Sequence, residues 1–117
     1  MTPEEMKRRT KAFAVRIITF AENLPRGRTI DRLARQLVDC STSVGANYRA
    51  ACLARSRAEF TSKLQISLEE ADESQYWLEV LSEAGFSGGP LHEDLHKEAK
   101  ELTSILMSGV KTVRGVT

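Results

Sequence analysis

The sequence is poor in the residues on which several common protein classes depend. Aromatic residues make up only 6% of its 117 residues, and it holds 3 prolines and 7 glycines. This composition argues against a β-sandwich and a collagen-like repeat, and a hydrophobic content of 41% argues against a disordered chain. The length is typical of one compact domain, so we expect residues 1–117 to form a single domain around one core.

Cysteine and long apolar runs are scarce as well. Cys40 and Cys52 are 12 residues apart, which is about 18 Å along the helix expected below and too far for a disulfide. No apolar run reaches the length of about 18 residues that a membrane-spanning helix needs. Arg16 interrupts the one stretch that resembles a secretory signal, residues 12–21, and no small-residue cleavage site follows it before Pro25. We therefore expect a cytoplasmic protein.

The chain also has almost no net charge, at +1, but its charges are unevenly distributed. Residues 1–57 hold twelve Lys or Arg against five Asp or Glu, a balance of +7, whereas residues 58–117 hold five against eleven, a balance of −6. Opposite halves of this kind complement each other between neighbouring helices or between subunits. A basic region also suits an anionic partner, and the sequence leaves these alternatives open.

Four segments have the apolar spacing of amphipathic helices, and we predict helices at about 3–24, 29–55, 57–84 and 90–112. The first begins at a capping box formed by Thr2 and Glu5, and it ends at Pro25 and Gly27. The expected core positions recur every three or four residues. They are Met6, Phe13, Ile17, Phe20 and Leu24 in the first segment; Ile30, Leu33, Leu37, Cys40, Val44, Asn47 and Ala51 in the second; Phe60, Leu64, Leu68, Ala71, Leu78 and Leu81 in the third; and Leu91, Leu95, Ala99, Leu102, Leu106 and Val110 in the fourth.

No glycine or proline separates the second segment from the third, but the phase of the apolar pattern changes near residue 56. There the run Ser56 to Glu59 has the spacing of a capping box, which predicts a new helix start. Short connections between four helices favour antiparallel neighbours. We therefore predict an all-α fold, an antiparallel up-down-up-down four-helix bundle.

One motif with metal chemistry is present. Residues 92–96 read His-Glu-Asp-Leu-His and match HExxH, in which two histidines one helical turn apart bind zinc and the glutamate activates water. We expect Leu91 and Leu95 to take the core face of this helix, which leaves His92 and His96 exposed without a further ligand. A metal-dependent hydrolase is therefore the third hypothesis, and we expect no catalytic residues and no cofactor.

Basic residues in the first two helices form a candidate nucleic-acid surface. Arg28, Arg32 and Arg35 share the outer face of the second helix, where arginines could neutralise phosphates. The alternative is a solvated surface with pairs such as Asp31 to Arg35. The full set of candidates is Lys7, Arg8, Arg9, Lys11, Arg28, Arg32, Arg35 and Arg49.

Two stretches, 42–51 and 63–78, resemble the bacterial four-helix-bundle family named after the protein encoded in intervening sequences of 23S ribosomal RNA genes. The resemblance spans nearly the whole chain. It implies a four-helix bundle that assembles as a homopentamer, with no known enzymatic activity. The family that the chain resembles also includes a protein of diversity-generating retroelements, which serves as a nucleic-acid-binding partner of a reverse transcriptase. The residues that carry the resemblance include Gly45, Asn47, Tyr48, Glu70, Glu73, Tyr76 and Trp77.

These family-motif residues have structural interpretations. Gly45 in mid-helix costs about 1 kcal/mol against Ala, which indicates the close approach of another helix. Asn47 on the apolar seam indicates a register-fixing amide, and its expected neighbour is Glu70, which could accept hydrogen bonds from Asn47 or Ser43. Trp77 shares a helix face with Glu73, beside the seam, where an aromatic residue favours a contact between subunits or a place at the edge of the core over a base-stacking platform.

Several apolar residues lie off the core stripes, so a lone bundle would expose them. Together with the opposite charges of the two halves, they indicate a cyclic homo-oligomer, and the number five comes only from the family resemblance. The leading hypothesis is a non-enzymatic oligomeric scaffold or interaction protein. The alternative is a nucleic-acid-binding accessory protein that contacts RNA or DNA phosphates, with a reverse transcriptase as the partner that the resemblance implies. The sequence indicates no membrane partner and no small-molecule substrate.

Overall fold

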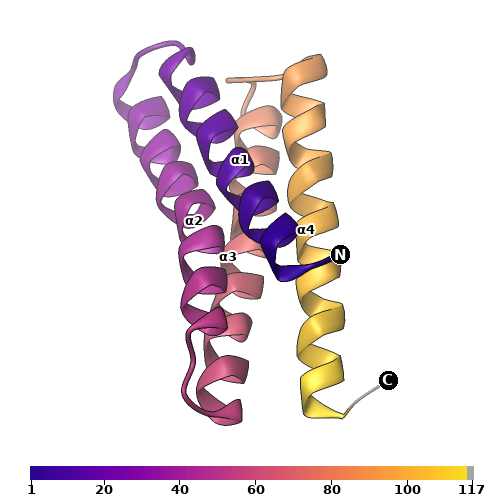
Figure 1. Ribbon diagram of the computed structural model, residues 1–117. Helices are drawn as coiled ribbons and strands as arrows, with labels where there is room; N and C mark the ends of the chain where they lie inside the picture. The colour runs from indigo at the N-terminus through magenta and orange to yellow at the C-terminus, as the bar shows by residue number, and fades with distance from the viewer. Residues whose placement is uncertain (116–117) are drawn as a thin grey trace.

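The computed structural model describes residues 1–115, and this part of the chain is all-α (Figure 1). Its four helices are α1 (Pro3–Glu22), α2 (Arg28–Cys52), α3 (Arg57–Glu83) and α4 (Pro90–Arg114). They form an elongated body of 44 × 24 × 21 Å. Within residues 1–115, none of the helices has both the length and the apolar character needed to cross a membrane.

Local sequence signals set the helix ends. The side chain of Thr2 accepts from the Glu5 amide, the Glu5 carboxylate accepts from the Thr2 amide, and this capping box starts α1. The Ser56 hydroxyl caps α3 by accepting from the Glu59 amide. α1 ends at Glu22 and α2 ends at Cys52, which is two and three residues before the predicted ends. α4 extends to Arg114, and Gly115 ends it in the left-handed conformation.

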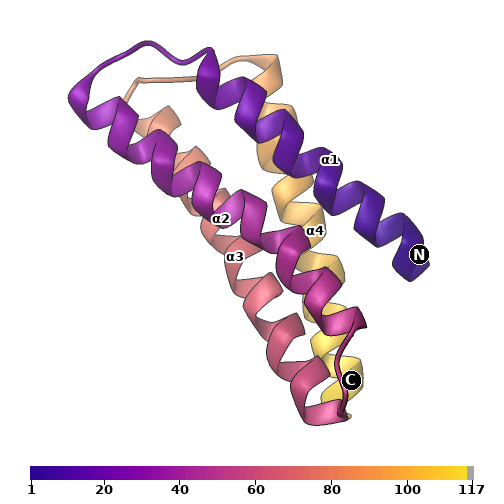
Figure 2. The ribbon, with the colours of Figure 1, turned by 60° about the vertical axis from the view of Figure 1, so that its left-hand side comes forward.

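The helices that follow one another in the sequence pack side by side, and α1 also packs on α4. Figure 1 shows the α1–α2 and α3–α4 connections at one end of the molecule and the α2–α3 connection at the other. In residues 1–115, α1 and α3 do not contact each other, and neither do α2 and α4. α1 and α3 therefore occupy diagonal corners and run in the same direction. Figure 2 shows α1 diverging from the other helices toward its N-terminus.

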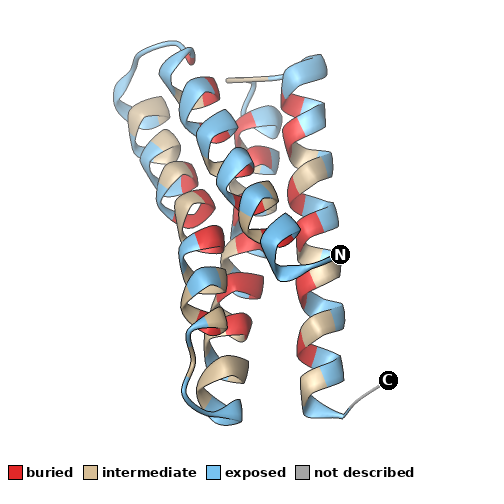
Figure 3. Ribbon diagram, viewed as in Figure 1, coloured by how far each residue is buried: buried red, intermediate tan, exposed pale blue. Residues whose placement is uncertain are grey.

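Side chains from all four helices form one apolar core, and the buried positions lie on the inner face of each helix (Figure 3). Every predicted core residue of α1 is buried. In α4 the prediction is wrong at one position, because Leu91 is 51% exposed and His92 is 5% exposed. The stripe of Leu95, Ala99 and Leu102 extends back to position 92 at the helical spacing, so Leu91 falls on the outer face of the first turn.

The α2–α3 contact contains small polar side chains as well as apolar ones. The Ser41 hydroxyl donates to the Ser74 hydroxyl at 3.0 Å, and the Ser67 hydroxyl donates to the Val44 carbonyl at 2.7 Å. All three serines are fully buried. Their hydrogen bonds satisfy the polar atoms, and their small size lets the two helices approach closely.

At Gly45, α1 approaches α2 closely. A Cβ atom at this position would lie 2.9 Å from Oγ1 of Thr10. This distance is shorter than van der Waals contact allows, so the helix needs glycine here. The close approach that the mid-helix glycine predicted is confirmed, and its partner is Thr10 of α1.

Candidate functional site

The cations of α1 divide into paired and unpaired ones. Arg9 makes a bidentate ion pair with Glu98 of α4, with both N–O distances at 2.7 Å, and it also approaches Glu101 at 3.6 Å. The hydrogen bonds to Glu98 raise the pKa of Arg9. Arg9 therefore fastens α1 to α4 through Nε and Nη2, and its role as a nucleic-acid contact stays a prediction.

The other candidates on α1 differ from Arg9. Lys7 pairs with Glu4 at 3.4 Å within the first turns of the helix. Arg8, Lys11 and Arg16 are exposed, and none of these three has an ion pair to any of residues 1–115. Their charge is therefore available to a partner from outside the chain.

The arginines of α2 are exposed on its outer face. Arg28, Arg32, Arg35 and Arg49 all point to solvent, and no ion pair to residues 1–115 involves them. The expected pair of Asp31 with Arg35 does not form. Instead, Arg26 in the α1–α2 connection binds Asp31 at 3.3 Å and lowers the pKa of that carboxyl group. The connection brings Arg26 over the first turn of α2, which leaves Arg35 free.

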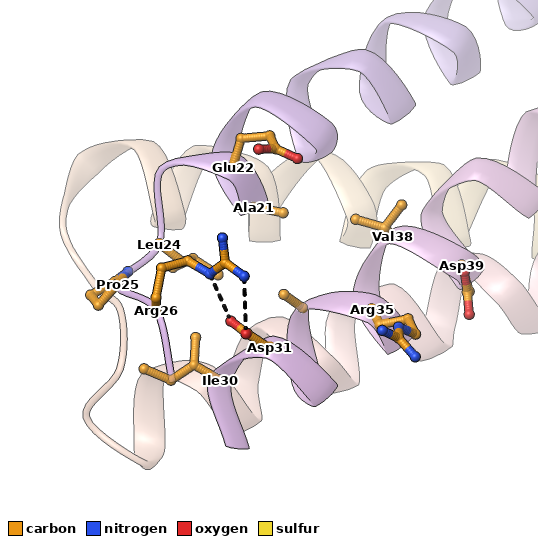
Figure 4. Close-up of a pocket in the computed structure, with 11 residues that line it drawn as sticks. Ala21, Glu22, Leu24, Pro25, Arg26, Ile30, Asp31, Arg35, Val38 and Asp39 are labelled. Atoms are coloured by element: carbon orange, nitrogen blue, oxygen red, sulfur yellow. Dashed lines mark hydrogen bonds and ion pairs between the residues drawn. The ribbon is translucent and has the colours of Figure 1, made fainter. Parts of the chain in front are cut away.

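Figure 4 shows the cavity beside this ion pair, between the end of α1 and the start of α2. Its volume is about 350 Å³. Its lining combines apolar side chains such as Ile30 and Val38 with the Arg26–Asp31 pair, Arg35 and Asp39. A second cavity of about 300 Å³ lies beside the N-terminal end of α1, and its walls include Met6, Phe60 and Leu64. Neither lining combines a nucleophile with an adjacent base, as covalent catalysis requires.

The outer surface of α3 is acidic. Between residues 64 and 83 this helix holds six carboxylates and no Lys or Arg. Burial is the main cause that raises the pKa of Glu70, and the neighbouring carboxylates of Glu73 and Glu69 raise it further. This acidic surface is the counterpart of the unpaired cations on α1.

The two histidines of the HExxH motif do not converge on one point. The His92 ring is buried, packs edge-to-face on Phe20 at a centroid distance of 5.7 Å, and has its Nδ1 2.9 Å from the Ser87 hydroxyl. Nε2 of His96 instead lies 2.8 Å from the Glu79 carboxylate of α3. In residues 1–115, no three His, Cys, Asp or Glu side chains are placed to hold a metal ion.

The predicted contact of Asn47 with Glu70 is wrong. The Asn47 amide donates to the Ser43 carbonyl of its own helix at 2.9 Å, and the Ser43 hydroxyl donates to the Asp39 carbonyl. Asn47 is only half-buried, so bonding within α2 satisfies it without a partner on α3. The structure gives Asn47 no role in fixing the register of the helices.

The aromatic residues of the family motif lie at helix surfaces. Nε1 of Trp77 donates to the Glu73 carboxylate at 3.3 Å, as their shared face predicted. Tyr76 is exposed, and its ring meets that of Trp77 edge-to-face at 5.0 Å. Tyr48 is half-buried beside Cys52, and burial raises its pKa to about 12.

The sequence did not predict two features of the contacts between helices. Glu98 was not recognised as the partner of Arg9, because the pairing of α1 with α4 is not encoded in local spacing. The buried serines of α2 and α3 were also missed, although Ser41, Ser67 and Ser74 lie at helical spacing from the apolar core positions. That spacing is the signal that could have found them.

Comparisons with known proteins connect this architecture to a family. Residues 4–108 match the family model of the 23S rRNA-intervening sequence protein. A crystal structure of a protein of unknown function from the S23 ribosomal protein family of Bacteroides thetaiotaomicron VPI-5482 is 34% identical to the chain. The match covers 95% of this chain and 99% of that one, with a TM-score of 0.86. A comparison with curated proteins finds no match.

Proposed function

This chain belongs to the 23S rRNA-intervening sequence protein family, and we propose that it acts as a non-enzymatic interaction protein that assembles from several copies. In this proposal the protomer is an up-down-up-down bundle and the assembly is a cyclic homo-oligomer in the cytoplasm. The observation that supports it is the separation of unpaired cations on α1 from a group of carboxylates on α3, at diagonal corners of the bundle.

Exposed apolar side chains support self-association as well. Val15 and Ile18 on α1 are 57% and 42% exposed, and Tyr76 on α3 is 55% exposed. Val15 lies one turn from Lys11, Ile18 lies between Arg16 and Glu22, and Tyr76 lies one turn from Asp72 and Glu79. An apolar patch bordered by charge is typical of a surface that is covered by a partner.

The mass in solution tests the proposal. We expect light scattering at micromolar concentration to give several times the protomer mass of 13.0 kDa, and five times if the number follows the family resemblance. Because the contact is partly ionic, we expect the assembly to weaken between about 0.1 M and 1 M salt. A mass near 13 kDa at both salt concentrations would rule out self-assembly.

A second function is favoured by the free arginines of α2. Arg28, Arg32 and Arg35 form a row of exposed guanidinium groups that have no carboxylate partner within residues 1–115. Such a row can neutralise successive phosphates of RNA or DNA, and several copies in one assembly would strengthen a weak contact by avidity. Nucleic-acid binding of this kind is compatible with self-assembly.

Salt titration tests nucleic-acid binding. We expect steep salt dependence and little sequence preference, because these arginines contact phosphates rather than base edges. Replacing Arg28, Arg32 and Arg35 with Ser should weaken binding and flatten the plot of log K against log salt. The matched control replaces three exposed lysines of α4 with Ser and should change binding less; these are Lys97, Lys100 and Lys111. Equal effects of both variants would exclude a specific role for the α2 row.

A further inference from the structure

Two stretches of helix surface carry charge of one sign, a basic one on α1 between Glu4 and Glu22 and an acidic one on α3 that ends at Glu79, the partner of His96. The basic face consists of Arg8, Lys11, Val15 and Ile18 on α1, and the acidic face consists of Glu69, Asp72, Tyr76 and Glu79 on α3. Both sets recur at intervals of three and four residues, so each forms one stripe along its helix. All eight residues are exposed. Each stripe lies roughly opposite the buried side of its helix.

The two faces cannot pair within one molecule. α1 and α3 occupy diagonal corners and make no contact with each other in residues 1–115, so their outer faces point in opposite directions. From residue 7 to residue 21, α1 holds five cations and no acid, whereas α3 from 64 to 83 holds six acids and no Lys or Arg. Only Arg9 of the α1 cations reaches across to another helix, and its partner lies on α4. The two faces therefore do not neutralise each other within one molecule.

The two faces also lie at the same height along the bundle. The Thr10 side chain of α1 packs against Gly45 of α2. The carbonyl of the adjacent Val44 accepts a hydrogen bond from the Ser67 hydroxyl of α3. These contacts place Thr10 and Ser67 at one level. Because α1 and α3 run in the same direction, positions counted from this level can be compared between the two helices.

Counted in this way, like heights carry complementary chemistry. Lys11 is one residue beyond Thr10, and Glu69 is two residues beyond Ser67. Further along, Ile18 is eight residues beyond Thr10, and Tyr76 is nine residues beyond Ser67. Within each pair the two counts differ by one residue, about 1.5 Å of rise along a helix. A cation thus lies level with a carboxylate, and an exposed aliphatic side chain lies level with an exposed aromatic ring.

We infer that a second copy of this chain docks its basic face on the acidic face of the first. The contact joins two different surfaces, so every copy binds one neighbour through its basic face and another through its acidic face. Because the complementary positions are level, successive copies follow one another with little shift along the bundle axis, and a contact of this kind closes into a ring when the rotation permits. This inference rests on the proposed self-assembly and specifies its interface and its polarity.

Reciprocal charge reversal tests the interface. One variant carries Arg8→Glu and Lys11→Glu, and the other carries Glu69→Lys and Asp72→Lys. Each variant alone presents two faces of like charge, so we expect light scattering to show monomers. Mixing the two variants restores a complementary contact in both directions, so the two variants should assemble in alternation into multimers that contain equal numbers of each. A chain with all four substitutions should assemble again, because both of its faces are reversed.

The controls separate this inference from the proposed function. Lys97→Glu with Lys100→Glu reverses the same amount of charge on α4 and should leave the assembly unchanged, while circular dichroism verifies that every variant is helical. If the unmodified chain is monomeric, self-assembly itself fails. If it assembles but the two face variants remain fully assembled, or their mixture stays monomeric, the inferred interface is wrong.

A disulfide experiment tests the same contact without changing charge. Ile18→Cys and Tyr76→Cys are introduced together into a chain with Cys52→Ser. Cys40 stays in place because it is buried and burial raises its thiol pKa to about 11. Mild oxidation should then link successive copies and give a ladder of covalent multimers on a denaturing gel. An assembled protein that gives only monomer bands, whereas the charge variants dissociate, would shift the contact away from these two positions and overturn the level pairing.

Discussion

Between α2 and α3 the side chains are small and hydrogen-bonded, whereas α1 meets the bundle mainly through large apolar side chains. Ser41 bonds to Ser74 across the α2–α3 contact, and Ser67 bonds to the backbone of α2. α1 instead inserts Phe13, Ile17 and Phe20 into the core. The first contact fixes its helices by shape and hydrogen-bond direction, and the second tolerates adjustment because apolar contact is not directional.

The difference between the two regions extends to length and charge. α1 has 20 residues, while α2, α3 and α4 have 25, 27 and 25. Within residues 1–115, its ion pairs to another helix are those of Arg9 with Glu98 and Glu101. The comparison indicates that α2 and α3 form the rigid frame of the protomer. α1 is the peripheral helix, and like α2 it carries unpaired cations.

The largest effect is expected where the α2–α3 contact is filled with a larger side chain. Ser74→Leu removes a buried hydrogen-bond partner and overpacks the contact, so we expect the free energy of unfolding to fall by about 3 kcal/mol. Ser74→Ala, which only removes the hydroxyl group, should cost about 1 kcal/mol. Urea denaturation followed by circular dichroism measures both. Equal stability of Ser74→Leu and the unmodified chain would mean that the α2–α3 contact is no tighter than that of α1.

The next effect concerns the one tight point of α1. Gly45→Ala places a Cβ atom against the Thr10 side chain, and we expect a loss of about 1 to 2 kcal/mol after the higher helix propensity of Ala is included. Thr10→Ala removes the nearest atom and should recover part of that loss. A double-mutant cycle measures this coupling, which should exceed about 0.5 kcal/mol. Additive effects would indicate that α1 moves away at no cost.

Breaking the ion pair of α1 should have a smaller effect. Arg9→Met keeps the apolar stem but leaves the partly buried Glu98 unpaired, and we expect a loss of about 1 kcal/mol. Arg8→Met, one residue earlier on the exposed face, should change the stability by less than about 0.5 kcal/mol. Chemical denaturation compares the two variants. Similar losses in both would contradict a specific fastening role for Arg9.

The buried histidine gives a pH dependence on the α4 side of the bundle. Burial lowers the pKa of His92 below its ordinary value of 6.5, so between the two pKa values the unfolded chain binds the proton and the folded chain does not. The stabilising contribution is complete above pH 6.5 and is lost as the pH falls toward the folded pKa. We expect His92→Phe to flatten this part of the stability profile, whereas His96→Gln should leave it in place. An unchanged profile in His92→Phe would assign the dependence to another group.

The smallest effect is expected at Asn47. Because its amide bonds only to the Ser43 carbonyl within α2, Asn47→Leu should change the free energy of unfolding by less than about 0.5 kcal/mol. Native mass spectrometry should find the same oligomer as in the unmodified chain. A mixture of oligomers would restore the register-fixing role that the apolar seam predicted.

The sequence was sufficient to predict features that depend on a single helix. The buried stripe of α1 follows from its spacing alone, and the phase change near residue 56 located the start of α3 at Arg57. Gly45 predicted a close contact between helices, because a glycine in the middle of a helix lowers its stability unless such a contact compensates for it. Family membership was predictable because the motif in α2 and α3 lies on two long, well-defined helices.

Features that depend on the arrangement of several helices were beyond the sequence. The spacing at the start of α4 permits Leu91 or His92 inside, and only packing against Phe20 selects His92. The partner of Asp31 depends on the path of the α1–α2 connection, which brings Arg26 close. The opposite charges of the two halves were visible, but whether they meet within the protomer depends on which helices are diagonal. That information is absent from local spacing.

The divergence of α1 from the bundle also has a consequence for hydrogen exchange. Opening of a helix requires the loss of the contacts that hold it, and α1 can leave without disturbing the serine hydrogen bonds between α2 and α3. Its amides should therefore exchange through a partial opening, while the amides around Val44 and Ser67 exchange only when the whole chain unfolds. A partner that covers the outer side of α1 would slow this opening, so the exchange rate of a single helix would report whether the surface is occupied.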